Sequence, residues 1–192
     1  MNIGLFFGSF NPIHTGHLII ASSILELETI DQVWLVISPQ NPFKESTSLI
    51  DEKHRLTMAE LATQNQVNLV PCDFEFDLPK PSYTYDTMVL LNKAYPKLNF
   101  TIIIGSDNLD GLSKWKESDK LTSDQKFIIY PRKDYNSQAY ANHPNFSFVD
   151  SPIIELSATD IRNRLKHDKS IEFRVSENIR TYISEQKLYK NT

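Results

Sequence analysis

The stretch that decides the fold is residues 3–17, which read IGLFFGSFNPIHTGH. Its first five residues are continuously apolar, which is typical of a short strand that is buried on both faces. A polar, turn-rich segment follows from Gly8 to Gly16, and apolar residues then recur at helical spacing from residue 17 to residue 28. The stretch therefore predicts a strand, a loop and a helix, in that order.

The same order recurs along the rest of the chain. Further strands are predicted at residues 33–37, 67–70, 99–104, 126–130 and 146–149, and helices from Asp51 and at residues 84–94, 157–165 and 175–187. This alternation predicts an α/β fold, a Rossmann-like open, mostly parallel sheet with helices on both faces. Residues 110–123 and 134–145 are the least regular and are expected to be surface loops. We expect one domain over residues 1–192, with its last helices within 157–192.

Composition limits the classes of function. The 192 residues are 40% apolar and 23% charged, as in an ordinary globular protein, and the net charge of −4 argues against broad nucleic-acid binding. The lone cysteine, Cys72, cannot form an internal disulfide and is expected to be a buried or half-buried thiol. No signal peptide is visible, and no stretch approaches the ~20 apolar residues of a membrane span. We therefore expect a cytoplasmic protein without a nucleic-acid or membrane partner.

Ligands of an open α/β sheet bind outside the carboxyl ends of its strands. Gly8 stands at such an end and Gly16 at the start of the next helix. This arrangement suits an anion of phosphate size, because glycine permits close approach and a helix start offers unpaired N–H groups. A tight turn that merely needs glycine fits equally well. His14 and His17 favour the anion site over the plain turn, because their imidazoles can donate hydrogen bonds to phosphate oxygens.

Residues 8–17 resemble the G-x-F-x-P-x-H-x-G-H signature of the nucleotidyltransferase superfamily. Residues 156–162, LSATDIR, resemble its second signature, I-S-S-T-x-I-R, with Ala158 where serine is common. Within the superfamily, the chain is similar to the bacterial nicotinate mononucleotide adenylyltransferases. The segments that carry this similarity are PQNPFK at 39–44, HRLTM at 54–58, SYTYDT at 82–87, and GSDN at 105–108 followed by Trp115.

The resemblance implies transfer of AMP from ATP to nicotinate mononucleotide, which gives nicotinate adenine dinucleotide and pyrophosphate in NAD biosynthesis. The attacking group would be the phosphate of the mononucleotide. Its second pKa is about 6, so it is mostly a dianion at pH 7 and needs no general base. Catalysis would then consist of positioning and electrostatic stabilisation. Mg²⁺ is expected with ATP, and no protein side chains are expected to hold a metal.

The implied catalytic residues are His14, His17, Lys44 and Arg162. His17 would contact the transferring α-phosphate, Lys44 would face the incoming phosphate, and Arg162 would bind the leaving phosphates. Contacts to ATP are implied for Gly8, Ser9, Phe10, His14, Gly16, His17, Gly105, Asp107, Ser157, Thr159 and Arg162. Contacts to the mononucleotide are implied for Lys44, Arg55, Tyr83, Thr84 and Trp115.

Several of these residues have plainer interpretations. Ser157 with Asp160 matches a helix capping box, Asp107 could be a turn residue after Gly105, and Trp115 could be a tryptophan of the hydrophobic core. Arg55 fits a phosphate contact or a salt bridge on a helix face. Tyr83 and Thr84 would hold the nicotinate carboxylate through backbone N–H groups, and donors without a nearby acidic group would favour the acid over the amide.

Three other functions stay open on the sequence alone. The acceptor could be nicotinamide mononucleotide or pantetheine phosphate, although the relatives that use pantetheine phosphate are shorter and lack the S-Y-T-x-D-T segment. A non-catalytic nucleotide-binding regulator would lose its phosphate-binding charge, whereas His14, His17, Lys44 and Arg162 are all present. Whether the chain forms a homo-oligomer is also open.

Overall fold

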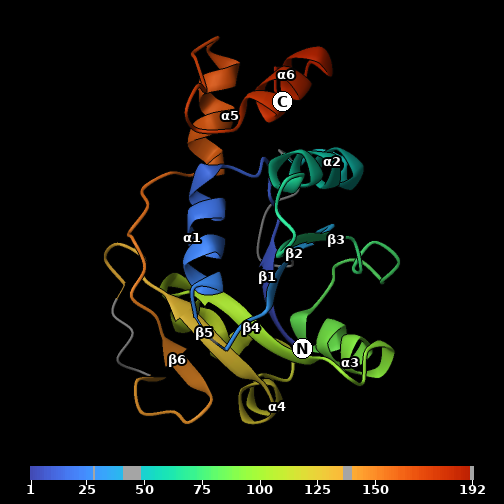
Figure 1. Cartoon of the computed structure of the whole chain (residues 1–192), viewed down its shortest axis with the longest axis vertical. Coiled ribbons are helices and arrows are strands. Elements are labelled where there is room, and N and C mark those ends of the chain that lie inside the picture. Colours follow the sequence, from blue (N-terminus) through green and yellow to red (C-terminus); the bar gives the residue numbers. More distant parts are fainter. Residues whose placement is uncertain (28, 41–48, 136–139, 191–192) are drawn as a thin grey trace.

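A six-stranded sheet in the order β3-β2-β1-β4-β5-β6 forms the centre of the computed structural model, which describes residues 1–27, 29–40, 49–135 and 140–190 (Figure 1). Its strands are β1 (Asn2–Gly8), β2 (Gln32–Ile37), β3 (Leu69–Cys72), β4 (Asn99–Gly105), β5 (Lys126–Tyr130) and β6 (Phe146–Phe148). Each of the five neighbouring pairs is parallel. The predicted α/β fold with a parallel sheet is therefore confirmed.

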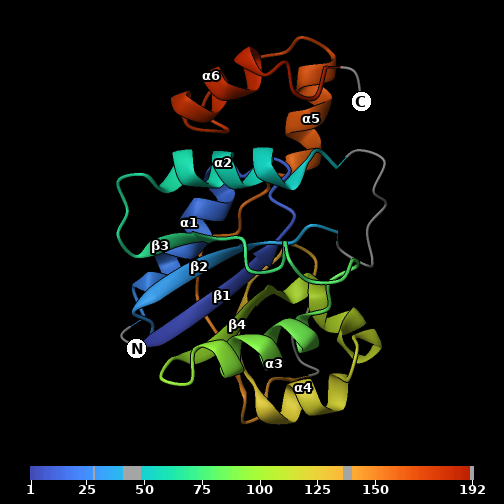
Figure 2. The same ribbon diagram turned by 90° about the vertical axis from the view of Figure 1, so that its right-hand side faces the viewer.

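Helices cover both faces of this sheet. They are α1 (Thr15–Leu25), α2 (Glu52–Thr63), α3 (Thr84–Ala94), the 3-10 helix η1 (Ser106–Lys114), α4 (Ser118–Asp124), α5 (Ala158–Lys166) and α6 (Glu177–Glu185). Helices α1 and α2 lie on one face and α3 and α4 on the other, while α5 and α6 lie at one end of the molecule, beyond α2 (Figures 1 and 2). None of the helices in the described part of the chain is long and apolar enough to cross a membrane.

Strand β1 shows how the sequence builds both layers. Successive side chains of a strand point to opposite faces. Ile3 and Leu5, both fully buried, pack in one cluster with Met88 of α3, whereas Phe6 packs in another with Ile20 of α1. From Ile3 to Phe7 the strand is apolar because it has a helical layer on each side.

The structure corrects several predicted boundaries. Residues 110–123, predicted as a surface loop, form the end of η1 and most of α4, because Leu112 and Leu121 are buried in the core. Strand β3 begins two residues later than predicted, and Val67 is 84% exposed. The last helix begins at Glu177 rather than at residue 175, because the Ser176 side chain accepts from the Ile179 N–H and caps it. Cys72 is half-buried, as expected.

The centre of the sheet is also the point at which its strand order reverses. From β1 the chain first adds β2 and β3 on one side, and then adds β4, β5 and β6 on the other. In such sheets a crevice opens outside the carboxyl ends of the two central strands. Gly8 ends β1 and Gly105 ends β4, so the loops that follow these glycines border this crevice.

Candidate active site

Two hollows meet at the carboxyl ends of β1 and β4. The large cleft has a volume of about 530 Å³, and the small cavity has a volume of about 100 Å³. The large cleft is lined by Phe6, Phe7, Gly8, Ser9, Phe10, Asn11, His14, His17, Leu49, Asp107, Asn108, Tyr130, Arg132, Leu156, Ser157, Ala158, Thr159 and Arg162. The small cavity is lined by Phe6, Phe7, Gly8, Ser38, Glu75, Ser82, Tyr83, Thr84, Tyr85, Ile103, Ile104, Gly105, Asn108, Trp115, Lys116 and Tyr130. Gly8 lies at the junction of the two hollows, together with Phe6, Phe7, Asn108 and Tyr130, which also line both.

The loop after β1 needs glycine at its start. A Cβ on Gly8 would lie 2.9 Å from the ring of Phe10, which is closer than real side chains approach. Phe10 has φ 44° and is 2% exposed, and its ring meets His17 edge-on at 5.0 Å between centroids. Besides lining the large cleft, Phe10 therefore supports the His17 ring from within the core.

His14 and His17 form a stacked pair at the start of α1. Their ring centroids are 3.7 Å apart, and the two planes differ by 22°. The backbone N–H of His14 donates to Nδ1 of His17 at 3.2 Å. Nδ1 of His17 must therefore be unprotonated, and a neutral His17 ring carries its hydrogen on Nε2. The sequence-predicted pair is thus brought together, with one ring held in a defined tautomer.

The charge state of His14 follows from its burial. The ring is only 4% exposed, and burial, followed by the nearby charge of Arg132, lowers the pKa of His14 to about 4. The imidazole is therefore neutral at pH 7. Its Nδ1 is buried and has no hydrogen-bond partner among the described residues. A Cβ on Gly16 would lie 3.1 Å from this atom, so glycine leaves room for the ring.

Helix α5 brings the second signature to the large cleft. The Ser157 hydroxyl accepts from the Asp160 N–H at 3.1 Å and caps the helix, so the capping interpretation holds alongside a place in the cleft. Arg162 donates through Nη1 to the Asn11 carbonyl at 2.8 Å and through Nη2 to the Thr159 hydroxyl at 3.2 Å. The two signatures, far apart in sequence, therefore meet across the cleft.

Arg132 is a cleft residue that the sequence reasoning missed. It follows β5, lies 3.7 Å from Asp107 between Nε and Oδ1, and stands over the Tyr130 ring at 5.4 Å from the centroid. The large cleft thus has a second guanidinium besides that of Arg162. No motif marks Arg132, and the one signal in the sequence is its place two residues after a predicted strand, at the carboxyl end where ligands bind.

The small cavity is lined by the S-Y-T segment, residues 82–84, and by Trp115. Tyr83 is the N-cap residue of α3 and Thr84 its first residue, while Trp115 follows η1 directly. The first backbone N–H groups of α3 therefore start at the cavity wall. Trp115 also packs against the core, so its two interpretations hold together.

An acidic residue also lines the small cavity, which corrects the expectation of donors without an acidic neighbour. Glu75 is 2% exposed and accepts hydrogen bonds of 2.7 Å from the hydroxyls of Ser82 and Thr87. Both of its carboxylate oxygens are thus engaged by residues that flank the Tyr83-Thr84 turn. Its spacing from Ser82 forms no recognised motif, so the sequence alone gave no signal for it.

Arg55 fits neither of its two expected roles. It is fully buried and lines neither hollow. Burial lowers the pKa of its guanidinium. It donates to the carbonyls of Ile50, Ser9, Ser38 and Pro39 at 2.6 to 3.1 Å. Arg55 therefore binds the loops after β1 and β2 to α2. Lys44, the other cation expected near the substrate, lies outside the described residues.

A parallel sheet with an H-x-G-H loop at its switch point is the arrangement of a nucleotidyltransferase, and residues 5–164 match the family model described as cytidylyltransferase-like. The chain belongs to this family. It is 45% identical over 191 residues to the "Probable nicotinate-nucleotide adenylyltransferase" of Cytophaga hutchinsonii, with 100% of both chains covered. It is 40% identical over 192 residues to the protein of that name from Flavobacterium johnsoniae, with 99% of this chain and 100% of the other covered.

A solved structure shares the fold. The nicotinic acid mononucleotide adenylyltransferase of Plasmodium falciparum, complexed with NaAD, matches with a TM-score of 0.86 at 23% identity, covering 100% of this chain and 98% of the other. These matches confirm the resemblance expected from the two signatures.

Proposed function

We propose that this chain transfers AMP from ATP to nicotinate mononucleotide, giving nicotinate adenine dinucleotide and pyrophosphate in NAD biosynthesis. The full-length similarity to proteins named for this reaction supports the proposal. The structural observation that carries it is the junction of the large cleft and the small cavity at Gly8. A dinucleotide product has two halves joined by a pyrophosphate, and two hollows that meet at a glycine suit that shape.

The large cleft would bind ATP. An oxygen of the mononucleotide phosphate attacks the α-phosphorus, and the bond from that phosphorus to the bridging oxygen of the β-phosphate breaks. Pyrophosphate leaves with the electron pair. No general base is needed because the attacking phosphate is already a dianion at pH 7. The task of the protein is to align two anions and to stabilise the charge on the leaving group.

The histidines suit that task in different ways. His14 is neutral, so it would donate one hydrogen bond to a phosphate oxygen without bringing a charge. His17, with its hydrogen on Nε2, would donate to the α-phosphate. Gly8, Ser9 and Gly16 would let the loop and the helix start approach the phosphates.

Two guanidiniums would complete the ATP site. Arg162, beside Ser157 and Thr159 at the start of α5, would bind the leaving phosphates bidentately. Arg132 would add positive charge near the triphosphate. Asp107, after Gly105, would accept from a ribose hydroxyl. Ala158 brings a methyl group where a serine would offer one more donor.

The small cavity would bind the nicotinate ring. Trp115 offers an aromatic face for stacking, and the backbone N–H groups of Tyr83 and Thr84 would donate to the carboxylate. Glu75 accepts from the hydroxyls of Ser82 and Thr87, so its part here would be to fix the turn beside the cavity rather than to contact the ligand. Lys44 would act on the incoming phosphate.

A divalent cation fits this site through ATP rather than through the protein. Asp107 is the one carboxylate among the described residues of the large cleft, and it is paired with Arg132 and Asn108. Mg²⁺ retains its waters readily and commonly binds through substrate phosphates. We therefore propose Mg²⁺ on the ATP phosphates, where it would neutralise their charge.

The test is release of pyrophosphate from ATP with Mg²⁺ and one of three acceptors: nicotinate mononucleotide, nicotinamide mononucleotide or phosphopantetheine. We expect a strong preference for the first. A preference for another acceptor would overturn the substrate assignment, and ATP binding without turnover on any of them would indicate a regulator.

The two tryptophans of the chain provide a matched pair of variants that tests the small cavity. Trp115→Phe should raise the KM for nicotinate mononucleotide, whereas Trp34→Phe, outside both hollows, should not.

A further inference from the structure

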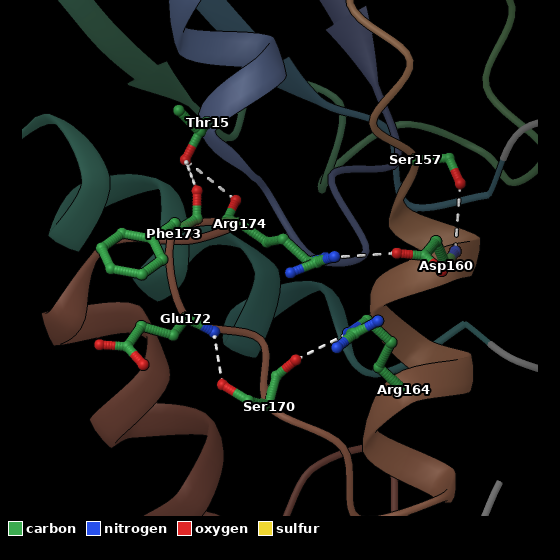
Figure 3. Close-up of polar contacts among 8 residues, drawn as sticks. All are labelled: Thr15, Ser157, Asp160, Arg164, Ser170, Glu172, Phe173 and Arg174. Atoms are coloured by element: carbon green, nitrogen blue, oxygen red, sulfur yellow. Dashed lines mark hydrogen bonds and ion pairs between the residues drawn. The ribbon is translucent and has the colours of Figure 1, made fainter.

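The segment that follows α5 turns back and is fastened to that helix at two places (Figure 3). Arg174 pairs with Asp160 in the first turn of α5, at 3.4 Å between Nε and Oδ2. Near the other end of the helix, Nε of Arg164 donates to the Ser170 carbonyl at 2.7 Å. Helix α5 and the returning segment therefore form one body, residues 158–174, which we call the α5 unit.

The α5 unit is attached to α1 by the first residue of that helix, Thr15 (Figure 3). The N–H of Thr15 donates to the Arg174 carbonyl at 2.9 Å. Its hydroxyl donates to the same carbonyl at 3.0 Å and contacts the Phe173 carbonyl at 3.3 Å. Apolar burial of Ile161 and Ile171 also holds the unit to the core, but burial has no preferred direction. The Thr15 hydrogen bonds are directional.

The backbone at Phe173 adopts an unfavourable conformation at this contact. Phe173 has φ 63°, a left-handed conformation that a bulky residue rarely adopts, and its side chain is 87% exposed. Packing of the ring therefore does not explain the conformation. What the turn achieves is to bring two successive carbonyls, of Phe173 and Arg174, to Thr15. Such strain persists only where the surroundings impose it.

We propose that Thr15 is a positioning residue, which fixes the α5 unit against the start of α1 and so sets the spacing between Arg162 and the pair of His14 and His17. The inference rests on the proposed function. Thr15 stands between the two histidines in sequence but does not line the large cleft. Its bonds can thus persist when phosphates bind. The bond from Arg162 to Asn11 is a less independent attachment, because the same guanidinium would also bind the leaving phosphates.

The experiment compares Thr15→Val with Thr15→Ser in the full chain. Valine keeps the shape and the backbone N–H but removes the hydroxyl, whereas serine keeps the hydroxyl. The matched control is Thr122→Val, because the Thr122 hydroxyl also bonds a backbone carbonyl but on α4, outside both hollows. For each variant we would measure kcat, the KM for each substrate, and hydrogen–deuterium exchange over residues 168–176.

We expect Thr15→Val to lower kcat about tenfold, because small displacements of groups that act in the transition state are costly. The KM for nicotinate mononucleotide should stay within about twofold, and exchange over 168–176 should rise. Thr15→Ser should retain most of the wild-type kcat, and Thr122→Val should match the wild type. A wild-type kcat in Thr15→Val, or equal losses in Thr15→Val and Thr122→Val, would overturn the proposal.

The exchange measurement separates this inference from the proposed function. A wild-type chain without adenylyltransferase activity would refute the function. Unchanged exchange over 168–176 in Thr15→Val would refute the attachment through Thr15, whatever the activity.

Discussion

Arg162 donates a hydrogen bond of 2.8 Å to the backbone carbonyl of Asn11, and this bond joins two segments that are 151 residues apart in sequence. The carbonyl belongs to the first signature and the guanidinium to the second. Tyr189, near the C-terminus, donates to the side chain of the same Asn11 at 2.9 Å. The cation that would receive the leaving phosphates is thus already held at the edge of the large cleft before a ligand arrives.

Replacement of Arg162 by lysine should lower kcat about 100-fold. Lysine keeps the charge but loses the planar fork that binds phosphate bidentately, and a hydrogen bond to a charged group is worth about 1.5–3 kcal/mol. Pyrophosphate release measures the loss of kcat, and thermal unfolding shows whether the variant keeps the stability of the wild type. The control is Arg180→Lys on α6, where the arginine forms an exposed pair with Glu177. Similar rates for the two variants would contradict the role of Arg162.

The stability of the chain should fall as the pH drops from 6.5 to 4, in part because of His14. Its folded-state pKa is lowered to about 4, so in this window the unfolded state binds a proton that the folded state does not. The shift corresponds to about 3 kcal/mol lost by pH 4. Asparagine also suits an N-cap and does not titrate. The difference in unfolding free energy between the wild type and His14→Asn should therefore change with pH by about this amount, and urea unfolding at pH 7, 5.5 and 4 would measure it. A difference that is independent of pH would refute the assignment.

Arg55→Met should destabilise the fold by about 3 kcal/mol. Methionine fills similar space but leaves the carbonyls of Ser9, Ser38 and Pro39 without this buried donor, and an unsatisfied buried polar group costs about 1–3 kcal/mol. Urea unfolding gives the value. The exposed Arg180→Met should change stability by less than about 0.5 kcal/mol. A phosphate-contact role would instead leave stability unchanged and reduce only turnover.

Glu75→Gln should raise the KM for nicotinate mononucleotide several-fold and leave the KM for ATP unchanged. A carboxylate accepts from both hydroxyls that flank the Tyr83-Thr84 turn, whereas a glutamine amide offers one acceptor oxygen and one donor nitrogen. The turn whose N–H groups are proposed to bind the nicotinate carboxylate should then lose its fixed position. Steady-state kinetics with each substrate varied in turn would show this, with the exposed Glu60→Gln as control. Parallel rises in both KM values would indicate general damage.

The order of elements was predictable because each central strand is a short apolar run followed by a turn signal. The same logic placed Gly8, His14, His17 and Gly105 at one edge of the sheet. It failed for residues 110–123, where Gly111 and several charged residues obscure a helical pattern that depends on two buried leucines, Leu112 and Leu121.

The site residues that sequence reasoning missed or misjudged act through tertiary contacts. Arg132 reaches the large cleft because β5 ends beside β4, and its own sequence neighbours do not indicate this. Glu75 gains its place from hydroxyls seven and twelve residues further along the chain. Arg55 was expected to make a phosphate contact or a salt bridge on a helix face, but three of its four acceptors come from loops that only the fold brings to α2.

The burial of Arg55 has a consequence for the electric field at both hollows. Two of the carbonyls that it binds belong to Ser9, which lines the large cleft, and to Ser38, which lines the small cavity. A peptide group has a negative oxygen end and a positive N–H end. Because the oxygen ends of these two groups accept from a buried cation, part of their negative charge is compensated by Arg55. A buried positive charge that lines neither hollow would in this way lower the electrostatic cost of binding an anion in each, a phosphate in the large cleft and a carboxylate in the small cavity.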